Sequence, residues 1–242
     1  MKPYHDVMQP TMTDADARKL LRRALGLLRR AYGPREWSGP DNAVDELVAT
    51  ILSQNTSDAN SSAGYRRLRR RFRKWSTVAD APVEEVERCI RVSGLSGIKV
   101  PRIQGILRQI RRERGTIDLE YLTALAPQDA YRQLVRFDGV GPKTALCVLL
   151  FALGVPVFPV DTHIFRIARR LGVLPESVPA ERAHEVLTPL IPAKDRYAMH
   201  ILLIAHGREI CRAQNPKCLD CDLLAMCPFG QRRAAELEER EA

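Results

Sequence analysis

The sequence lacks the features of several protein classes. No stretch approaches the roughly 18 consecutive apolar residues of a membrane span, and the N-terminal segment MKPYHDVMQPTMTDADARK has no apolar core typical of a secretory signal. No segment alternates apolar and polar residues convincingly enough to predict a β-strand. These absences predict a cytoplasmic, all-α protein that does not bind membranes.

The sequence also has fewer acidic than basic residues. The chain has 29 Asp and Glu against 38 Lys and Arg, which gives a formal net charge of +9 over 242 residues. This excess fits a partner that carries many phosphates, such as a nucleic acid. Charge alone leaves open a basic protein with no such partner.

Four of the six cysteines lie close together near the C-terminus, with the spacing C-x6-C-x2-C-x5-C: Cys211, Cys218, Cys221 and Cys227. Thiols in a reducing cytosol stay unpaired, so the cluster indicates metal or cofactor ligation. Four thiolates can hold tetrahedral zinc or a four-iron cluster, and spacing alone slightly favours zinc. The histidines share no ligand spacing with one another.

Two apolar helical runs flank the turn Gly139-Val140-Gly141, whose glycines permit positive φ and close approach to another molecule such as a phosphate. Pro142 is suited to the first helical position, which places Lys143 in the first turn of a helix that continues towards Gly154. The helix dipole and the apolar run both disfavour the ammonium form, so we predict a nucleophilic amine. A solvated surface lysine is the alternative.

Asp161 precedes a predicted helix from Thr162 to Leu171. Its side chain is suited to the N-cap position, which is sufficient by itself to explain an aspartate there. Because an N-cap carboxylate lies at the edge of its helix, capping is compatible with a catalytic role.

The motifs Gly-Val-Gly-Pro-Lys-Thr-Ala and Val-Asp-Thr-His-Ile resemble the helix-hairpin-helix and Gly/Pro-rich loop plus Asp signature of the endonuclease III family of DNA glycosylases. The resemblance runs from about Leu20 to Cys227. It implies that Lys143 is the nucleophile and Asp161 its catalytic partner. It also implies that the hairpin contacts DNA through Gly139, Val140, Gly141 and Thr144.

Two residues beside the hairpin depart from the family pattern. Asp138 stands where many members carry Pro, and Pro142 stands where Arg is common. Neither change removes a catalytic group. Both are expected to weaken backbone contacts to DNA.

Two further segments resemble parts of the family that enter the duplex. The polar segment 53–58 resembles the segment that supplies an amide to fill the space left by an extruded nucleotide, so Gln54 or Asn55 is a candidate; alternatively, these residues only end one helix and cap the next. The glycine-rich segment 93–97 resembles the loop whose apolar wedge enters the base stack, which makes Leu95 the wedge. Alternatively, Leu95 holds its loop against the core.

The resemblance also bears on the cysteines, because their spacing matches the four-iron four-sulfur cluster of the family. It implies one 4Fe-4S cluster with a structural or redox-sensing role, and DNA phosphate contacts from Arg212 and Lys217 on the loop that it braces. The basic run 66–74 is a further candidate for phosphate contacts, although we expect it to be mainly the solvated face of a helix.

The resemblance implies two helical lobes with the DNA in a cleft between them and the catalytic pair at its mouth. The predicted parts are a flexible leader (1–12), an N-terminal helix of the iron-sulfur lobe (13–36), a central helical domain with the hairpin (37–154), the cluster lobe (155–230) and a charged tail (231–242).

We therefore expect a monomeric, cytoplasmic enzyme that meets the nucleoid through DNA binding. It would act on duplex DNA as a bifunctional glycosylase and abasic-site lyase for oxidised or damaged pyrimidines. A monofunctional adenine glycosylase is one alternative, but such relatives usually lack the lysine and carry a C-terminal domain for which the chain leaves no room. A non-catalytic iron-sulfur DNA-binding or damage-sensing protein and a zinc-stabilised binding module are the others.

Overall fold

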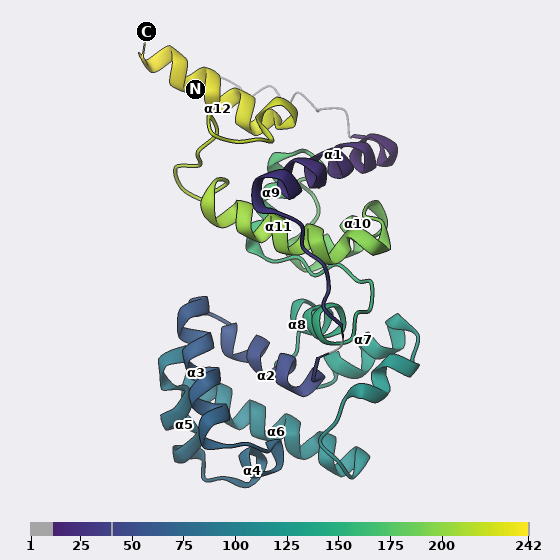
Figure 1. Cartoon of the computed structure of the whole chain (residues 1–242), viewed down its shortest axis with the longest axis vertical. Coiled ribbons are helices and arrows are strands. Elements are labelled where there is room, and N and C mark those ends of the chain that lie inside the picture. Colours follow the sequence, from purple (N-terminus) through teal and green to yellow (C-terminus); the bar gives the residue numbers. More distant parts are fainter. Residues whose placement is uncertain (1–11, 40, 242) are drawn as a thin grey trace. The chain divides into compact units, whose positions relative to one another are not determined.

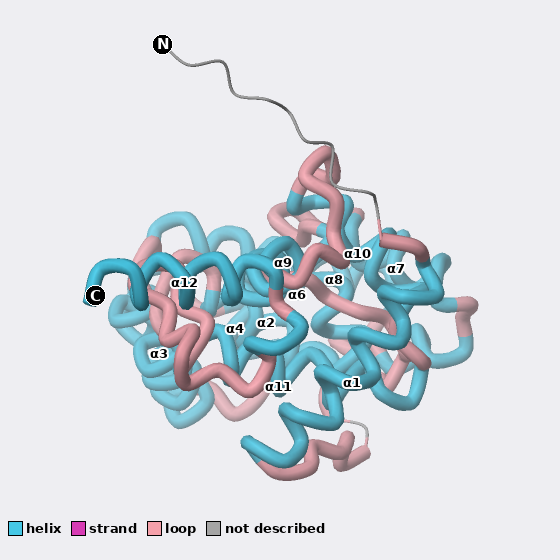
Figure 2. The backbone as a smooth tube through the Cα atoms, turned by 90° about the horizontal axis from the view of Figure 1, so that it is seen from above, coloured by secondary structure: helices cyan, strands magenta, loops and turns pink. Residues whose placement is uncertain are grey.

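The computed structural model describes residues 12–39 and 41–241, and these form helices and loops without a strand (Figure 2). This confirms the all-α prediction. Residues 37–159 make one compact unit, while the two ends of the chain, up to residue 36 and from residue 160, make the other. Residues 1–11 of the predicted leader lie outside the described residues. Within the described ranges, no helix has the length and apolar character needed to cross a membrane.

The unit of residues 37–159 is a bundle around helix α2, Ala43–Ser53, whose apolar residues recur at helical spacing and are buried. The Asn42 side chain caps this helix by accepting hydrogen bonds from the backbone N–H groups of Val44 and Asp45, both at 3.0 Å. Helix α2 packs against α3 (Asp58–Arg71), α6 (Ser96–Arg114) and α8 (Pro142–Cys147). In turn, α4 (Trp75–Asp80) and α5 (Val83–Ile90) pack on α6, and α7 (Pro127–Val135) packs on α8 (Figure 1).

The helix predicted from Pro142 towards Gly154 changes type midway. After α8 the chain forms a π-helical turn, Val148–Ala152, in which the Leu153 N–H donates to the Val148 carbonyl at 3.3 Å. The Phe151 carbonyl near the end of the helix accepts a hydrogen bond from Trp37 Nε1 at 2.8 Å. A Cβ on Gly154 would lie 2.5 Å from the Trp37 ring, which is too close for any other residue. The glycine therefore makes room for the tryptophan.

The other unit joins both ends of the chain. Helix α11 (Arg196–Glu209) packs against α1 (Asp14–Tyr32) and α9 (Thr162–Arg170), and α10 (Ala183–Leu187) and α12 (Pro228–Glu241) complete the unit (Figure 1). Thr13 caps α1, because its Oγ1 accepts a hydrogen bond from the Asp16 N–H at 3.2 Å. The charged tail continues α12 as a helix.

One glycine lies inside a helix and does not end it. Glycine is a common signal for a helix C-terminus, but α11 continues through Gly207 to Glu209. A Cβ on Gly207 would lie 2.7 Å from the Cβ of His163, so the glycine allows α9 to approach α11 closely. Tertiary packing outweighs the roughly 1 kcal/mol that glycine costs inside a helix.

Candidate functional site

The turn between α7 and α8 is held from within its own unit. Gly139 has φ of 72°, and the Arg102 side chain from α6 fills the place where a Cβ would lie. The Val140 side chain is buried, and its N–H donates to the Phe137 carbonyl at 3.0 Å. Val140 therefore offers only its backbone to a ligand, and Gly141 is exposed.

Lys143 is the exposed residue of an otherwise shielded helix. It lies in the first turn of α8, as predicted, and the four residues after it are buried. Its neighbour Thr144 accepts a hydrogen bond from Gln54 Nε2 at 3.3 Å, and the Thr144 side chain is buried. The helix thus presents one primary amine directly after the glycine turn.

Asp161 lies in the other unit and caps α9, as the sequence predicted. Its Oδ1 accepts the Ile164 N–H at 2.8 Å, and the residue is partly exposed. This bond fixes the carboxylate at the helix N-terminus and leaves its second oxygen available as an acceptor.

The structure separates the two amide candidates of segment 53–58. Gln54 donates to the Gly139 carbonyl at 3.4 Å as well as to Thr144, so its amide braces the hairpin. Asn55 is exposed and has φ of 54°, in the turn between α2 and α3. Asn55 is therefore the amide that can reach a ligand without breaking internal contacts.

Leu95 is 51% exposed and has φ of 50° at the N-cap of α6. A left-handed conformation costs a branched residue about 1–2 kcal/mol, so the surrounding loop must hold it there. This exposure contradicts the alternative in which Leu95 packs its loop onto the core. An apolar side chain held in water at a strained position is suited to insertion between bases.

A buried lysine that the sequence analysis missed connects these two segments. Lys99 is 1% exposed, and its Nζ donates to the carbonyls of Leu52 and Ser93, both at 2.8 Å. Leu52 precedes the segment with Asn55, and Ser93 precedes the loop with Leu95. Sequence periodicity could have indicated that Lys99 is buried, because position 99 lies on the same apolar stripe of α6 as the buried Ile103, Ile106 and Ile110.

The four C-terminal cysteines line one pocket together with Ile210, Leu224 and Phe229: Cys211, Cys218, Cys221 and Cys227. All four are free thiols. Two sulfurs receive hydrogen bonds from donors suited to a thiolate: Arg170 Nη1 lies 3.2 Å from the Cys211 Sγ, and the Gly230 N–H lies 3.3 Å from the Cys227 Sγ. Among the described residues, no three His, Cys, Asp or Glu side chains converge tightly enough to hold a metal ion.

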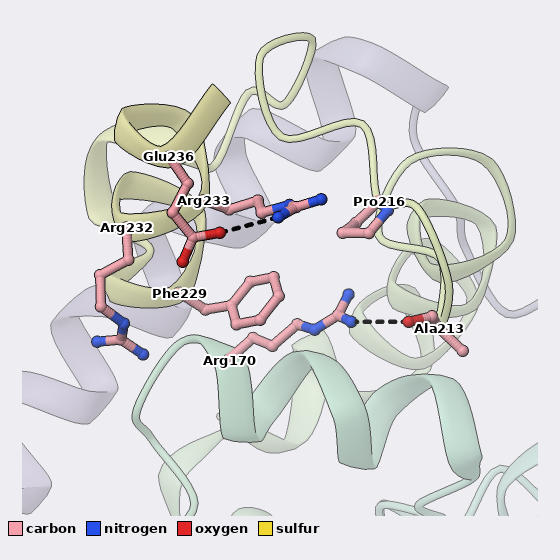
Figure 3. Close-up of a pocket in the computed structure, with 7 residues that line it drawn as sticks. All are labelled: Arg170, Ala213, Pro216, Phe229, Arg232, Arg233 and Glu236. Atoms are coloured by element: carbon pink, nitrogen blue, oxygen red, sulfur yellow. Dashed lines mark hydrogen bonds and ion pairs between the residues drawn. The ribbon is translucent and has the colours of Figure 1, made fainter. Parts of the chain in front are cut away.

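Arg170, at the end of α9, also holds the loop that carries Arg212 and Lys217. Its guanidinium donates to the Arg212 carbonyl at 2.7 Å and the Ala213 carbonyl at 3.2 Å, and it lies 4.2 Å from the centre of the Phe229 ring (Figure 3). Seven residues line an adjoining pocket of about 370 Å³: Arg170, Ala213, Pro216, Phe229, Arg232, Arg233 and Glu236. The side chains of Arg212 and Lys217 are exposed on this loop.

Comparison with known proteins decides the family. Residues 48–192 match the HhH-GPD superfamily of base excision DNA repair proteins. The endonuclease III of Bacillus subtilis is 32% identical over 192 residues, which cover 79% of this chain and 84% of that protein. The chain belongs to the endonuclease III family. Its superfamily makes it a base excision repair DNA glycosylase.

Other relatives and structures agree with this assignment. The endonuclease III of Thermotoga maritima is 34% identical over 77% of this chain and 83% of that protein. A protein of Arabidopsis thaliana described as a DNA glycosylase is 39% identical over 168 residues; the match covers 69% of this chain and 57%, less than two thirds, of the plant protein. A trapped endonuclease III–DNA covalent intermediate superposes with a TM-score of 0.77 at 28% identity, over 90% of this chain and 98% of that one.

The departure from the endonuclease III pattern at Asp138 has a local partner. Asp138 Oδ2 lies 3.6 Å from Arg102 Nε, too far for a hydrogen bond but close enough for an ion pair. The Arg102 Nε is buried and makes no hydrogen bond, whereas Asp138 is largely exposed. Asp138 therefore offsets the charge of an arginine that lies against the glycine turn.

Replacing Asp138 with Asn should strengthen binding to undamaged duplex DNA, because it removes the negative charge beside Arg102. We expect the slope of log K against log salt to steepen by up to about 0.9, the value for one additional phosphate contact. Fluorescence anisotropy at several salt concentrations measures this slope. The Asp80→Asn variant, which removes the same charge from the ion pair with Arg111 on the same helix α6, is the control. Equal slopes in the two variants would contradict the prediction.

Glu46 on α2 is a second charged residue that the sequence analysis missed. Burial raises its pKa to about 7, opposed by the hydrogen bond that Thr50 Oγ1 donates to its Oε1 at 2.9 Å and by the positive charge of Lys143. The signal in the sequence was a pair of polar residues four positions apart, Glu46 and Thr50, on an otherwise apolar helix.

The Glu46→Gln variant should gain stability at alkaline pH only. Folding raises the pKa of the Glu46 carboxyl from its ordinary value of 4.5 to about 7. The free energy of unfolding therefore decreases as pH rises through this range, because the folded protein binds the proton more tightly than the unfolded chain does. At pH 8 the substitution should increase the free energy of unfolding by up to about 3 kcal/mol. At pH 4.5 the gain should vanish.

Denaturant unfolding at both pH values, with the exposed Glu84→Gln as a control, measures the difference. A gain of the same size at both pH values would show that the charge of Glu46 is not responsible.

Proposed function

We propose that the protein is a bifunctional DNA glycosylase that removes oxidised or damaged pyrimidines from duplex DNA and then cleaves the strand at the abasic site. The observation that carries this proposal is the single exposed amine of Lys143 in the first turn of α8, followed by four buried residues. An amine nucleophile forms a covalent intermediate with the sugar. The similar structure of a trapped covalent endonuclease III–DNA intermediate supports this chemistry.

The reaction requires the damaged nucleotide to leave the stack, because its anomeric carbon is inaccessible inside the duplex. Leu95 would enter between the bases, and Asn55 would fill the vacated space. The Lys143 amine attacks the anomeric carbon and expels the base, while Asp161 assists deprotonation of Lys143 and stabilises positive charge on the sugar. The resulting Schiff base acidifies the 2′ proton, and β-elimination cuts the strand.

Binding of the duplex would use backbone and surface groups. Gly139 and Gly141 allow a DNA phosphate to approach the hairpin backbone, and Arg212 and Lys217 would contact phosphates from the exposed loop. We also propose that the protein acts as a monomer and that it binds nucleoid DNA in the cytoplasm.

The cysteine pocket would hold one 4Fe-4S cluster. Its donor set fits, because four free cysteines line one pocket and four cysteine thiolates are the usual ligands of such a cluster. The cluster would supply cross-linking of the loop that Arg170 holds, or redox sensing, and not the bond-breaking step. Iron analysis and visible absorption test this; a purified protein that contains one zinc ion and no iron would contradict it.

Borohydride trapping tests the proposed reaction. Native protein incubated with a duplex that carries an oxidised pyrimidine or an abasic site should give a covalent adduct, and peptide mass spectrometry should map it to Lys143. Release of the base without an adduct would indicate a monofunctional glycosylase. Duplex binding with neither release nor adduct would indicate a non-catalytic DNA-binding protein.

A further inference from the structure

The pocket of about 370 Å³ beside the cysteine pocket lies entirely within the unit that joins both ends of the chain. Its walls come from three separate segments: Arg170 at the end of α9, the loop at residues 213–216, and the N-terminal half of α12 (Figure 3). Pockets of this volume commonly hold small ligands. The reaction proposed for Lys143 does not use this pocket.

The residues that line the pocket are mainly positively charged. Three arginines stand against one carboxylate, that of Glu236, which gives the lining residues a formal net charge of +2. Glu236 Oε2 accepts a hydrogen bond from Arg233 Nη1 at 2.8 Å. Both side chains of this ion pair are partly exposed, and exposed pairs stabilise a protein little, so Arg233 can exchange the carboxylate for a ligand.

The order of charges along α12 does not account for these arginines. Arg232 and Arg233 lie in the N-terminal half of the helix, and four glutamates and one arginine follow them. The helix dipole favours the opposite order, with acidic residues near the N-terminus. An arginine that precedes its glutamate is also the weaker orientation of a helical ion pair. Helix stability therefore does not favour arginines at these positions, whereas an anion in the pocket would offset their charge.

The protein holds Arg170 in position for such a ligand. Its guanidinium donates to two carbonyls of the loop, at 2.7 and 3.2 Å, and lies 4.2 Å from the centre of the Phe229 ring. Its Nη1 also lies 3.2 Å from Cys211 Sγ, so Arg170 connects this pocket to the cysteine pocket. Figure 3 shows the side chains of Arg170 and Arg233 extending past the Phe229 ring towards the loop with Pro216. A guanidinium that is already held loses little conformational freedom when a ligand binds.

We propose that this pocket binds a phosphate group. Arg170 and Arg233 present guanidiniums from two different helices, and guanidiniums are suited to donating paired hydrogen bonds to phosphate oxygens. The oxygens of a phosphate point in several directions, so one phosphate accepts from both helices at once. Two sources carry this chemistry, the backbone of duplex DNA and free inorganic phosphate. The site is distinct from Lys143, so it does not depend on the proposed lyase reaction.

Isothermal titration calorimetry with inorganic phosphate tests the site in the full-length protein. The native protein should show saturable binding. Arg233→Gln should bind phosphate at least about 10-fold more weakly, because it loses a charge-assisted hydrogen bond. Glu236→Gln should bind phosphate more tightly, because it removes the carboxylate that competes for Arg233.

Two comparisons separate ligand binding from a loss of structure. Arg233→Gln and Glu236→Gln break the same ion pair, so a structural effect would change phosphate affinity in the same direction in both variants. Arg182→Gln is the matched control, because Arg182 lies in the same unit and pairs with Glu185 at 2.9 Å, three residues further on, but does not line the pocket. This variant should bind phosphate as the native protein does.

Fluorescence anisotropy with an undamaged duplex identifies the source of the phosphate. If it belongs to DNA, Arg233→Gln should flatten the slope of log K against log salt by up to about 0.9 relative to Arg182→Gln, and the duplex should exclude inorganic phosphate from the pocket. If it is free phosphate, the slope should stay the same, and phosphate should still bind the protein–duplex complex. The proposal is overturned if Arg233→Gln differs from Arg182→Gln neither in phosphate affinity nor in salt slope.

Discussion

Replacing Lys143 with Ala should lower the rate of strand cleavage at an abasic site by at least about 10³-fold, because the variant has no amine at the start of α8. Binding to the same duplex should stay within a few-fold of native. The lysine side chain is exposed and alanine is a good helix former, so the substitution should leave α8 and its buried face intact.

Single-turnover cleavage of a labelled duplex measures this rate, and anisotropy measures the affinity. The Lys74→Ala variant removes an exposed lysine from the same unit and should cleave at the native rate. Loss of cleavage in both variants would point to a general charge effect. Native cleavage by Lys143→Ala would assign the amine to another residue.

Replacing Lys99 with Met should decrease the free energy of unfolding by about 3–5 kcal/mol, because it leaves the buried carbonyls of Leu52 and Ser93 without their donor. It should also release the segments that carry Asn55 and Leu95. We therefore expect the variant to lose most of its preference for damaged over undamaged duplex at a temperature where it is still folded.

The same helix provides a matched control for this effect. Gln104 is also buried, and its Nε2 donates to the carbonyls of Val78 and Ala81 at 2.9 and 2.8 Å. Gln104→Met should destabilise the unit but keep the preference for damaged DNA. Chemical denaturation and competition binding measure the two quantities. Equal loss of preference in both variants would show that α6 stability alone matters, and not the contacts of Lys99.

Much of this architecture follows from local patterns. The cap at Asp161, the place of Lys143 in the first turn of α8 and the absence of strands from the described ranges all depend on residues near one another in sequence. The sequence could therefore predict them. The same holds for the loop of Leu95, whose glycines mark a turn.

The features that escaped prediction depend on partners far away along the chain. Helix propensity says nothing about the burial of Lys99, which is explained by its hydrogen bonds to the carbonyls of Ser93 and of Leu52, 47 residues earlier. The pKa of Glu46 is raised by its burial, and that burial depends on helices packed against α2 that are distant in the sequence. Gly207 carries a stop signal for a helix, yet the packing of His163 against it decided the outcome. Such choices are made by tertiary contacts, which residue periodicity does not report.

The unit built from both ends of the chain also constrains how the protein matures on the ribosome. Helix α1 buries Leu21, Leu25 and Leu28, but its packing partner α11 begins at Arg196. At about 5–20 residues per second, α1 waits roughly 8 to 35 seconds for that partner. During this interval its apolar stripe is a target for chaperones, while residues 37–159 can already fold as a continuous segment.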